Sequence, residues 1–529
     1  MKDSKLHLSG LITLVTVFFF WGFLAASNGV FIPFCKEHFE LNQFQSQLID
    51  TAFYGAYYFG ALFLFLYSSK KKQDIVNKWG YKTTIIYGLA ISGVGASLMI
   101  PAVKLGSFSF ILLSLFIIAI GFCLQQTSAN PFTISIGAPE TGAHRLNLAG
   151  GINSLGTTIG PIILSILLFG GITNTTTEIE SINILYIFLA ILFIIMALFL
   201  KYSKNLPNIK HISKVTSSPK ASQLLIILTI AIVVLSILSV IKNIQENHII
   251  STTILFLLLF TVIYIISKPL FIKNKTLKDW GAMKYPQLTL GMLAIFSYVG
   301  VEVTIQSNLG ALLNTEDFGN IDASQNSHFI AMYWGSLMIG RWLGAITIFK
   351  PKKLLKNILF IIIPYLAFII VLFFIKLTDG EIASLKLFSV CILIQILGFL
   401  LGKEKPIKTL FIFSVLAIAA MIYGICTTGL VSIYAFLSGG LFCSIMWPCI
   451  FSLSIAGLKE YTSQGSSFLI MMILGGAIIP PIQGKIADIW DIHYSYIITI
   501  LCFLYIAFFA LKTQNILKTQ SIDYESKFE

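Results

Sequence analysis

Long apolar stretches separated by short polar segments run along the whole chain. Each stretch is about 20 residues long, which is the length that an α-helix needs to cross roughly 30 Å of hydrocarbon. Six of them lie in the first 200 residues, at 10–34, 46–68, 82–102, 108–134, 146–170 and 181–200. Ten more follow, at 222–242, 249–272, 286–313, 328–349, 356–376, 383–402, 406–426, 430–456, 464–484 and 492–512. The pattern predicts an all-α polytopic membrane protein with about 16 transmembrane helices.

The apolar stretches also repeat each other in order. The residues FYGAYYFG at Phe53–Gly60 return 280 positions later as YWGSLMIG at Tyr333–Gly340. The residues FTISI at Phe132–Ile136 return as FSLSI at Phe451–Ile455, now 319 positions later. The offset therefore grows by 39, the difference between 319 and 280, which is about the length of one extra pair of short helices. Ordered matches of this kind indicate two homologous halves.

The growing offset indicates helices added to a core of two equal lobes. Without the stretches at 222–272 and 356–402, six predicted helices remain in each half. We therefore predict an N-terminal six-helix lobe over 1–201, an inter-lobe segment with two extra helices over 202–285, and a C-terminal six-helix lobe over 286–529 with a helix pair inserted at about 356–402. The lobes are expected to run parallel, related by an axis along the membrane normal.

Basic residues gather in the loops of one side of this predicted arrangement. If the N-terminus is cytoplasmic, 30 of the 36 lysines and arginines lie on that side, because only six lie elsewhere. This asymmetry is what the positive-inside rule expects, and it predicts that both termini are cytoplasmic. The six exceptions are Lys36, Lys104, Lys242, Lys376, Lys386 and Lys485.

The overall composition excludes several classes of protein. Hydrophobic residues make up 56% and charged residues 11% of the 529 positions, and the mean hydropathy is +0.86, unlike a soluble domain. The net charge of +13 does not indicate nucleic-acid binding, because the lysines lie in loops between apolar stretches. Seven scattered cysteines without a CxxC pair indicate neither a disulfide framework nor a thiolate metal site. Without an HExxH, GxSxG or Walker sequence, we expect no enzyme activity and no cofactor.

Two carboxylates lie inside predicted helices, where an ionisable group costs roughly 2.5 to 3.5 kcal/mol and usually carries function. Glu302 lies one turn after Tyr298 and one turn before Gln306, so helical spacing places all three on one face. Asp50 shares a helix face with Tyr54 in the same way. Either carboxylate could instead be structural, Asp50 as a helix cap near the outer end and Glu302 as a buried pair.

Neutral polar residues gather in the fourth and fifth predicted helices. Gln126 and Asn130 lie one turn apart, and Asn153 follows in a polar run with Asn147, Gly150, Gly151, Ser154 and Thr157. Amides donate and accept hydrogen bonds and aromatic rings pack on sugar C–H faces, so such a lining suits a polyhydroxylated solute. Trp334 and Trp447 are candidate stacking surfaces. Amides also join membrane helices, so a structural role stays open for each of them.

Only two arginines occur, Arg145 and Arg341, and both fall at predicted cytoplasmic helix ends. We interpret them as anchoring or gating residues rather than substrate ligands.

Eight stretches in both lobes form a distinctive set: 20–33, 45–60, 128–132, 145–156, 298–306, 333–340, 444–454 and 461–484. Together they resemble the fucose:proton symporter branch of the Major Facilitator Superfamily, and still more its bacterial glucose/galactose transporters. The resemblance implies a twelve-helix transporter core, alternating access, ion-driven sugar uptake and a bacterial inner-membrane location.

The chain departs from the fucose symporter at the positions that carry protons there. Where that relative has an aspartate in its first helix and a glutamate in its fourth, this chain has Gly29 and Gln126. Neither residue can carry a proton, so the resemblance does not transfer that mechanism, and sodium becomes a plausible coupling ion. A sugar-site amide of that relative corresponds to Gly150, while Asn153 is retained, which leaves more room in the site.

The main hypothesis is therefore a monomeric, cation-coupled hexose importer in the lipid bilayer, driven by Na⁺ or H⁺. Glu302 and Asp50 are the candidate cation-coupling residues, and no metal site beyond the coupling ion is expected. The candidate sugar-binding residues are Gln126, Asn130, Asn153, Gln306, Tyr54, Tyr298 and Trp334. Two alternatives stay open: a facilitator without ion coupling, and a sugar sensor that does not transport.

Overall fold

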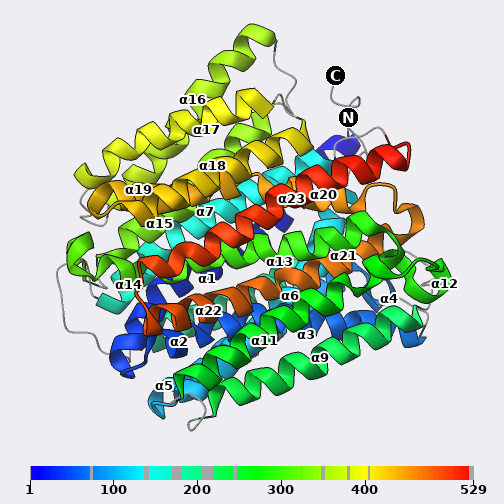
Figure 1. Cartoon of the computed structure of the whole chain (residues 1–529), viewed down its shortest axis with the longest axis horizontal. Coiled ribbons are helices and arrows are strands. Elements are labelled where there is room, and N and C mark those ends of the chain that lie inside the picture. Colours follow the sequence, from blue (N-terminus) through cyan, green and yellow to red (C-terminus); the bar gives the residue numbers. More distant parts are fainter. Residues whose placement is uncertain are drawn as a thin grey trace.

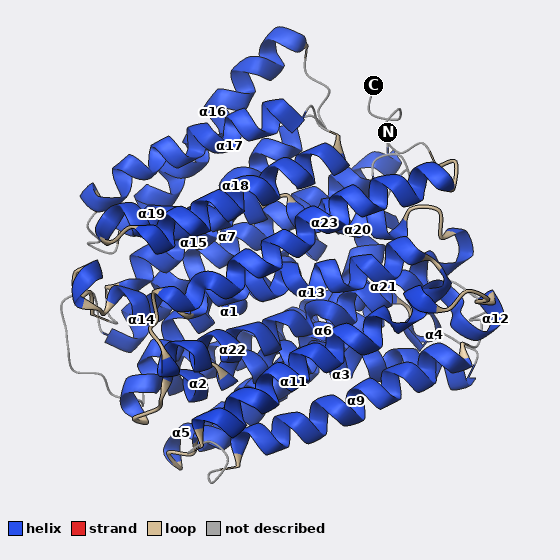
Figure 2. Cartoon of the chain, viewed as in Figure 1, coloured by secondary structure: helices blue, strands red, loops and turns tan. Residues whose placement is uncertain are grey.

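The chain folds into a bundle of long helices. The computed structural model describes residues 2–71, 75–135, 142–169, 181–203, 218–241, 247–322, 325–346, 352–377, 382–402 and 405–522. Within these ranges the regular structure is helical, with no strand (Figure 2). The long helices of the first half are α1 (Lys2–His38), α3 (Leu48–Lys71), α5 (Tyr81–Lys104), α6 (Phe108–Ser135), α7 (Gly142–Phe169) and α8 (Ser181–Tyr202).

Two long helices then lead to the second half of the chain. They are α9 (Pro219–Val240) and α11 (His248–Ser267). The main helices of the second half are α13 (Pro286–Ser307), α15 (Asn326–Ala345), α16 (Lys353–Lys376), α17 (Ser389–Gly402), α18 (Pro406–Cys426), α19 (Gly429–Cys443), α20 (Met446–Ile455), α21 (Thr462–Met471), α22 (Gly475–Ile489) and α23 (Ile497–Thr519). Short helices are α2 (Gln43–Ser46), α4 (Ile75–Trp79), α12 (Leu277–Trp280) and α14 (Leu309–Leu313).

The described helices make this a multi-pass membrane protein. Within the described residues, 14 segments are long and apolar enough to cross a membrane. Four of them contain a break between two α-helices, because α2 with α3, α13 with α14, α19 with α20 and α21 with α22 each form one segment. Helices α7 and α15 occupy the places of the predicted spans at 146–170 and 328–349 but are not among the 14, so the predicted total of sixteen is not confirmed.

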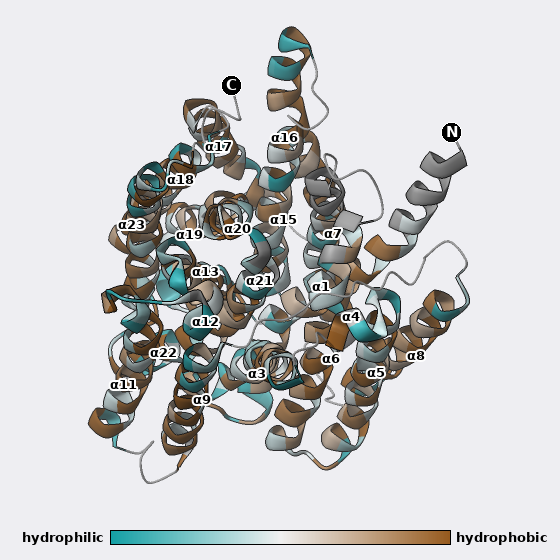
Figure 3. Cartoon of the chain, turned by 90° about the vertical axis from the view of Figure 1, so that its right-hand side faces the viewer, coloured by the Kyte–Doolittle hydropathy of each residue, from teal (hydrophilic) through white to brown (hydrophobic). Residues whose placement is uncertain are grey.

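Apolar side chains cover the outside of the bundle. In Figure 3 the ribbons of the peripheral helices α5, α8, α9 and α11 carry much of the brown that marks hydrophobic residues. Phe188 on α8 is 58% exposed and Phe260 on α11 is 62% exposed, although large rings in a water-soluble protein are usually buried. Lipid tails solvate such side chains, and the helices satisfy their own backbone hydrogen bonds, which hydrocarbon requires. The start of α1 and the end of α23 lie at one end of the bundle, and α2 and α14 at the other (Figure 1).

Helices α1 and α7 approach each other closely because glycines line their contact. A Cβ atom added at Gly156 of α7 would lie 2.2 Å from the Phe19 carbonyl oxygen of α1. A Cβ atom added at Gly160 would lie 2.3 Å from the Phe23 carbonyl oxygen. Backbone oxygens cannot rotate away, so larger side chains would force the helices apart. Small residues therefore set this spacing, as they do at many membrane helix crossings.

The substitution Gly156→Val is expected to separate α1 from α7 and to destabilise the protein by about 1–3 kcal/mol, the usual cost of overpacking. Thermal unfolding of purified protein in detergent, followed by intrinsic fluorescence, measures this as a lower melting temperature. Gly150→Ala on the same helix is the matched control, because a Cβ atom there has no neighbouring atom within 4 Å. Equal melting temperatures for the two variants would contradict the packing argument.

The two added helix pairs lie at the periphery of the bundle (Figure 1). Helices α9 and α11 pack on each other, and α11 also contacts α13 and α22. Helix α16 packs on α15, and α17 packs on α18 and α19. The buried Gln395 of α17 donates from Nε2 to the Leu441 carbonyl oxygen of α19 at 2.9 Å. The main contacts between the first and second halves come instead from α1, α2, α3 and α7 on one side and α13, α15, α21 and α22 on the other.

Candidate functional site

A carboxylate, a phenol and a guanidinium meet where the two halves of the chain face each other. Tyr298 of α13 donates its hydroxyl to Glu302 Oε1, one turn later on the same helix, at 2.5 Å. Arg341, near the end of α15, places Nη2 3.5 Å from the same Glu302 oxygen. The predicted shared face of Tyr298 and Glu302 is therefore present, and an arginine completes the group.

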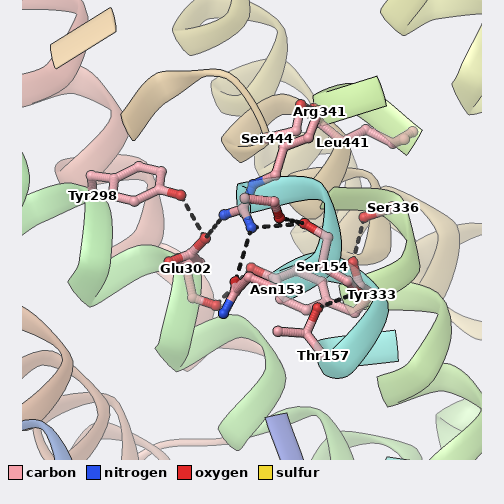
Figure 4. A network of polar contacts seen from close by, with 11 residues as sticks. Asn153, Ser154, Thr157, Tyr298, Glu302, Tyr333, Ser336, Arg341, Leu441 and Ser444 are labelled. Atoms are coloured by element: carbon pink, nitrogen blue, oxygen red, sulfur yellow. Dashed lines mark hydrogen bonds and ion pairs between the residues drawn. The ribbon is translucent and has the colours of Figure 1, made fainter. Parts of the chain in front are cut away.

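The same arginine joins the second half of the chain to the first. Its Nη1 donates to Ser154 Oγ of α7 at 2.8 Å and to Asn153 Oδ1 at 3.4 Å. Asn153 donates in turn from Nδ2 to the Phe18 carbonyl oxygen of α1 at 2.9 Å. Figure 4 shows the guanidinium between Glu302 on one side and the two α7 side chains on the other. The fixed fork of a guanidinium suits such a bridge, because it offers several donors in one plane.

This bridge is mostly, but not completely, buried. The Glu302 side chain is 12% exposed and the Arg341 side chain is 23% exposed. In such surroundings the attraction between opposite charges is far stronger than in water, and removing either partner leaves the other uncompensated. Gly150, one turn before Ser154 on α7, borders open space. Room therefore remains close to the bridge.

Aromatic side chains support the carboxylate from α15 and α20. Tyr333 donates its hydroxyl to the Glu302 carbonyl oxygen at 2.7 Å. The ring of the buried Trp334 meets the Tyr333 ring edge-on, with centroids 5.7 Å apart. The Trp447 ring of α20 lies 5.9 Å from the Tyr298 ring. Of the predicted aromatic walls, Tyr298 contacts the carboxylate directly, and Trp334 lies behind Tyr333.

The predicted amides of α6 lie apart from this bridge. Gln126 donates from Nε2 to the Tyr57 hydroxyl of α3 at 3.2 Å. Asn130, one turn later, is half-buried. No hydrogen bond joins either amide to Glu302 or Arg341 in the part of the chain that the structure describes. The side chains of Arg145 and Asn147 lie outside that part.

A second polar group lies at the end of the bundle that holds α2 and α14. We call it the polar seam; it comprises Gln43, Gln47 and Asp50 from the first half and Gln306, Ser307, Asn308 and Asp488 from the second half. Gln43 donates from Nε2 to Asn308 Oδ1 at 2.9 Å. The two Asp488 carboxylate oxygens each accept a backbone N–H from the first turn of α2, at 3.0 Å. Negative charge is favoured at a helix N-terminus, so these contacts hold the seam closed.

Asp50 is fully buried within the polar seam. Its carboxylate accepts a hydrogen bond from Asn28 Nδ2 at 3.3 Å and another from the Ser307 hydroxyl. The Ser307 hydroxyl accepts in turn from Gln306 Nε2 at 2.8 Å. Gln306 therefore belongs to the surroundings of Asp50, although its spacing also suits the face of Glu302. Asp50 bonds side chains of two other helices rather than capping its own.

Two further predicted residues pack closely beside the polar seam. The Tyr54 ring lies against Gly476 of α22, where an added Cβ atom would be 2.9 Å from the ring. A Cβ atom added at Gly29 would lie 2.0 Å from Gln306 Oε1. The space that an acidic side chain would need at position 29 is thus occupied by an amide.

Sequence reasoning missed the central position of Arg341. We expected an anchor or a gate at a helix end, and Arg341 does lie four residues before the end of α15. Its long side chain nevertheless reaches Glu302 and α7. A signal was available, because Arg341 directly follows the repeated stretch Tyr333–Gly340 and is surrounded by apolar residues. Ser307 was missed without such a signal, since a serine at a helix end is common.

Comparison with known proteins decides the family. The model of the Major Facilitator Superfamily matches residues 12–402. The chain belongs to the Major Facilitator Superfamily. It is therefore a membrane transporter and not an enzyme, and the family assignment agrees with the resemblance drawn from the motifs.

The similarity to individual relatives extends over almost the whole chain. A glucose/galactose transporter of Brucella abortus is 29% identical over 517 residues, covering 96% of this chain and 95% of the relative. A putative glucose/galactose transporter of Helicobacter pylori is 29% identical over 510 residues, covering 94% and 95%. The L-fucose-proton symporter of Escherichia coli is 24% identical over 517 residues, covering 96% and 94%. Within the superfamily the chain is thus similar to glucose/galactose transporters and to L-fucose-proton symporters along almost its whole length.

Solved structures confirm the fold. A crystal structure of the Escherichia coli fucose:proton symporter superposes with a TM-score of 0.56 at 22% identity, covering 96% of this chain and 99% of that one. A bacterial homologue of the lysosomal transporter Spinster, in an inward-facing conformation, superposes with a TM-score of 0.53 at 13% identity. The helix arrangement of this superfamily is therefore the arrangement seen here.

Proposed function

We propose that this chain imports a hexose, of the glucose or galactose type, by cation symport through alternating access. The relatives named as glucose/galactose transporters and as proton symporters support both parts of the proposal. The observation that carries it is the Arg341 bridge, which links Glu302 of α13 to Asn153 and Ser154 of α7. A polar, partly exposed bridge between two halves of a membrane carrier is a group that a hydroxylated solute can bind and rearrange.

In this proposal sugar hydroxyls replace the contacts that Arg341 makes to α7. The asparagine amide both donates and accepts, so it can bond a hydroxyl as well as a guanidinium. When Arg341 loses its contacts to α7, the two halves of the chain are no longer joined at this site. The charge of Glu302 stays compensated, either by Arg341 or by an arriving cation. Glu302 and Asp50 are the proposed cation-coupling residues. The proposed sugar ligands are Gln126, Asn130, Asn153 and Gln306, with walls from Tyr54, Tyr298 and Trp334.

The proposal also includes the membrane arrangement. All sixteen predicted helices cross a bacterial inner membrane as two lobes, 1–201 and 286–529, with the segment 202–285 between them. Both termini are cytoplasmic, so the polar seam faces the outside. The protein works as a monomer.

A cation gradient supplies enough free energy for this task. One charge that moves down 100 mV releases about 2.3 kcal/mol. A tenfold concentration ratio needs about 1.4 kcal/mol, so one coupled cation supports roughly fifty-fold accumulation of sugar.

Uptake by purified protein in liposomes tests the proposal. Radiolabelled glucose and galactose are expected to accumulate inside when a sodium or proton gradient points inward, and to equilibrate only when the gradient is collapsed by an ionophore. Liposomes without protein are the control. No uptake of any hexose under either gradient would refute the transport proposal and favour a membrane sugar sensor.

One observation favours a facilitator as the second candidate. In the structure Glu302 is already neutralised by Arg341, and a carboxylate compensated in this way needs no ion. Counterflow separates the two possibilities. A facilitator exchanges sugar equally with and without a sodium gradient and never accumulates it.

A further inference from the structure

The polar seam contains a buried carboxyl group without a cationic partner. Asp50 is 0% exposed. The ion pairs among the described residues are Lys220 with Asp279 and Arg341 with Glu302, so Asp50 belongs to neither. Its two hydrogen-bond donors, Asn28 and Ser307, are neutral. A buried carboxylate costs several kcal/mol unless a proton, a cation or strong hydrogen bonds compensate it.

Two buried amides that bond Ser307, as Asp50 does, also have oxygens without partners. Gln47 and Gln306 are both 0% exposed, and neither Gln47 Oε1 nor Gln306 Oε1 accepts a hydrogen bond from any described group. Both side chains are fixed through their nitrogens to one residue. Gln47 Nε2 donates to the Ser307 carbonyl oxygen at 3.2 Å, and Gln306 Nε2 donates to the Ser307 hydroxyl at 2.8 Å. Asp50 accepts from that same hydroxyl, so all three side chains meet at Ser307.

We propose that Asp50, Gln47 and Gln306 form a binding site for one sodium ion between the two halves of the chain. Carboxylate and amide oxygens are the ligands that hard cations prefer. A single carboxylate matches a monovalent ion, whereas a divalent ion would leave an uncompensated positive charge in a buried place. A proton on Asp50 would use only one of the two unpartnered oxygens, while a coordinated cation uses both.

The ligands come from opposite halves of the chain, so a bound ion would join the two halves. Gln47 and Asp50 lie at the α2–α3 junction, whereas Gln306 lies at the end of α13. The three ligands come together only when the polar seam is closed. An ion that binds the closed seam more tightly than the open seam therefore stabilises the closed state. The inference deepens the proposed cation symport and rests on it only for the use of the ion, since binding itself needs no sugar.

Sodium binding to the purified full-length protein tests the site in the absence of sugar. We expect saturable binding of radioactive sodium that potassium and choline do not displace, together with a higher melting temperature in sodium than in choline at equal ionic strength. Asp50→Asn is expected to weaken sodium binding by at least about tenfold, or 1.4 kcal/mol. Asp317→Asn makes the same chemical change at an exposed aspartate outside the polar seam and is expected to bind sodium like the unmodified protein.

A second variant covers the case in which Asp50→Asn does not fold. Gln306→Leu keeps the side-chain volume, removes an unpartnered buried oxygen, and is expected to retain its stability in choline while losing the stabilisation by sodium. Absence of sodium binding by the unmodified protein, or undiminished binding by Asp50→Asn or by a folded Gln306→Leu, would overturn the site. Intact sodium binding without sugar uptake would instead refute the proposed function and leave the site standing.

Discussion

Replacing Glu302 by glutamine is expected to abolish accumulation of sugar while leaving exchange across the membrane measurable. Glutamine keeps the shape of the side chain and still accepts from Tyr298 and Arg341, but it carries no charge. If Glu302 alternates between Arg341 and a coupling cation, the variant loses the alternation and keeps the sugar contacts. Accumulation should fall from roughly fifty-fold, the value for one coupled charge at 100 mV, to simple equilibration. Uphill uptake and counterflow in the same liposome preparation measure the two activities.

The matched control for this experiment is Glu316→Gln, which makes the same chemical change at an exposed glutamate that follows α14. It should accumulate sugar like the unmodified protein. Undiminished uphill uptake by Glu302→Gln would remove Glu302 from the coupling mechanism.

Replacing Arg341 by alanine is expected to reduce all transport, exchange included, by more than about 100-fold. Glu302 would lose its cationic partner, and breaking one side of a buried pair costs about 3–5 kcal/mol. The same substitution removes the hydrogen bonds from α15 to Asn153 and Ser154, so α7 would lose its polar link to the second half. Initial rates of counterflow give the size of the loss, and fluorescence-detected gel filtration shows whether the variant is folded.

Two further variants assign the cause of this loss. Arg341→Lys keeps the charge without the fork and should recover part of the activity, because an ammonium cannot contact Glu302 and α7 in the same planar geometry. The double variant Glu302→Gln with Arg341→Gln removes both charges and should be more stable than Arg341→Ala. If Arg341→Ala exchanges sugar at the normal rate, the bridge is not part of the transport pathway.

Periodicity and repeats predicted the helices well because lipid imposes one length and one kind of structure on every span. The helical spacing of Tyr298 and Glu302 was enough to predict a contact within α13, since both partners lie on the same helix. Contacts between helices were not predictable in this way. Arg341 reaches Glu302 across a helix interface, and the Ser307 hydroxyl of α13 donates to Asp50 of α3. Both contacts depend on how helices rotate against each other, which the sequence pattern of one helix does not determine.

Helix α13 contributes residues to both polar groups of this molecule, the Arg341–Glu302 bridge and the polar seam. Glu302 and Ser307 are separated by five positions, which is about 7.5 Å along a helix axis. If α13 moves as a rigid helix, a tilt that breaks the contacts of Glu302 also displaces Ser307, and the reverse holds as well. Binding of sugar near Glu302 and binding of an ion near Ser307 are then coupled by the rigidity of one helix, without a chain of side-chain contacts between the two sites.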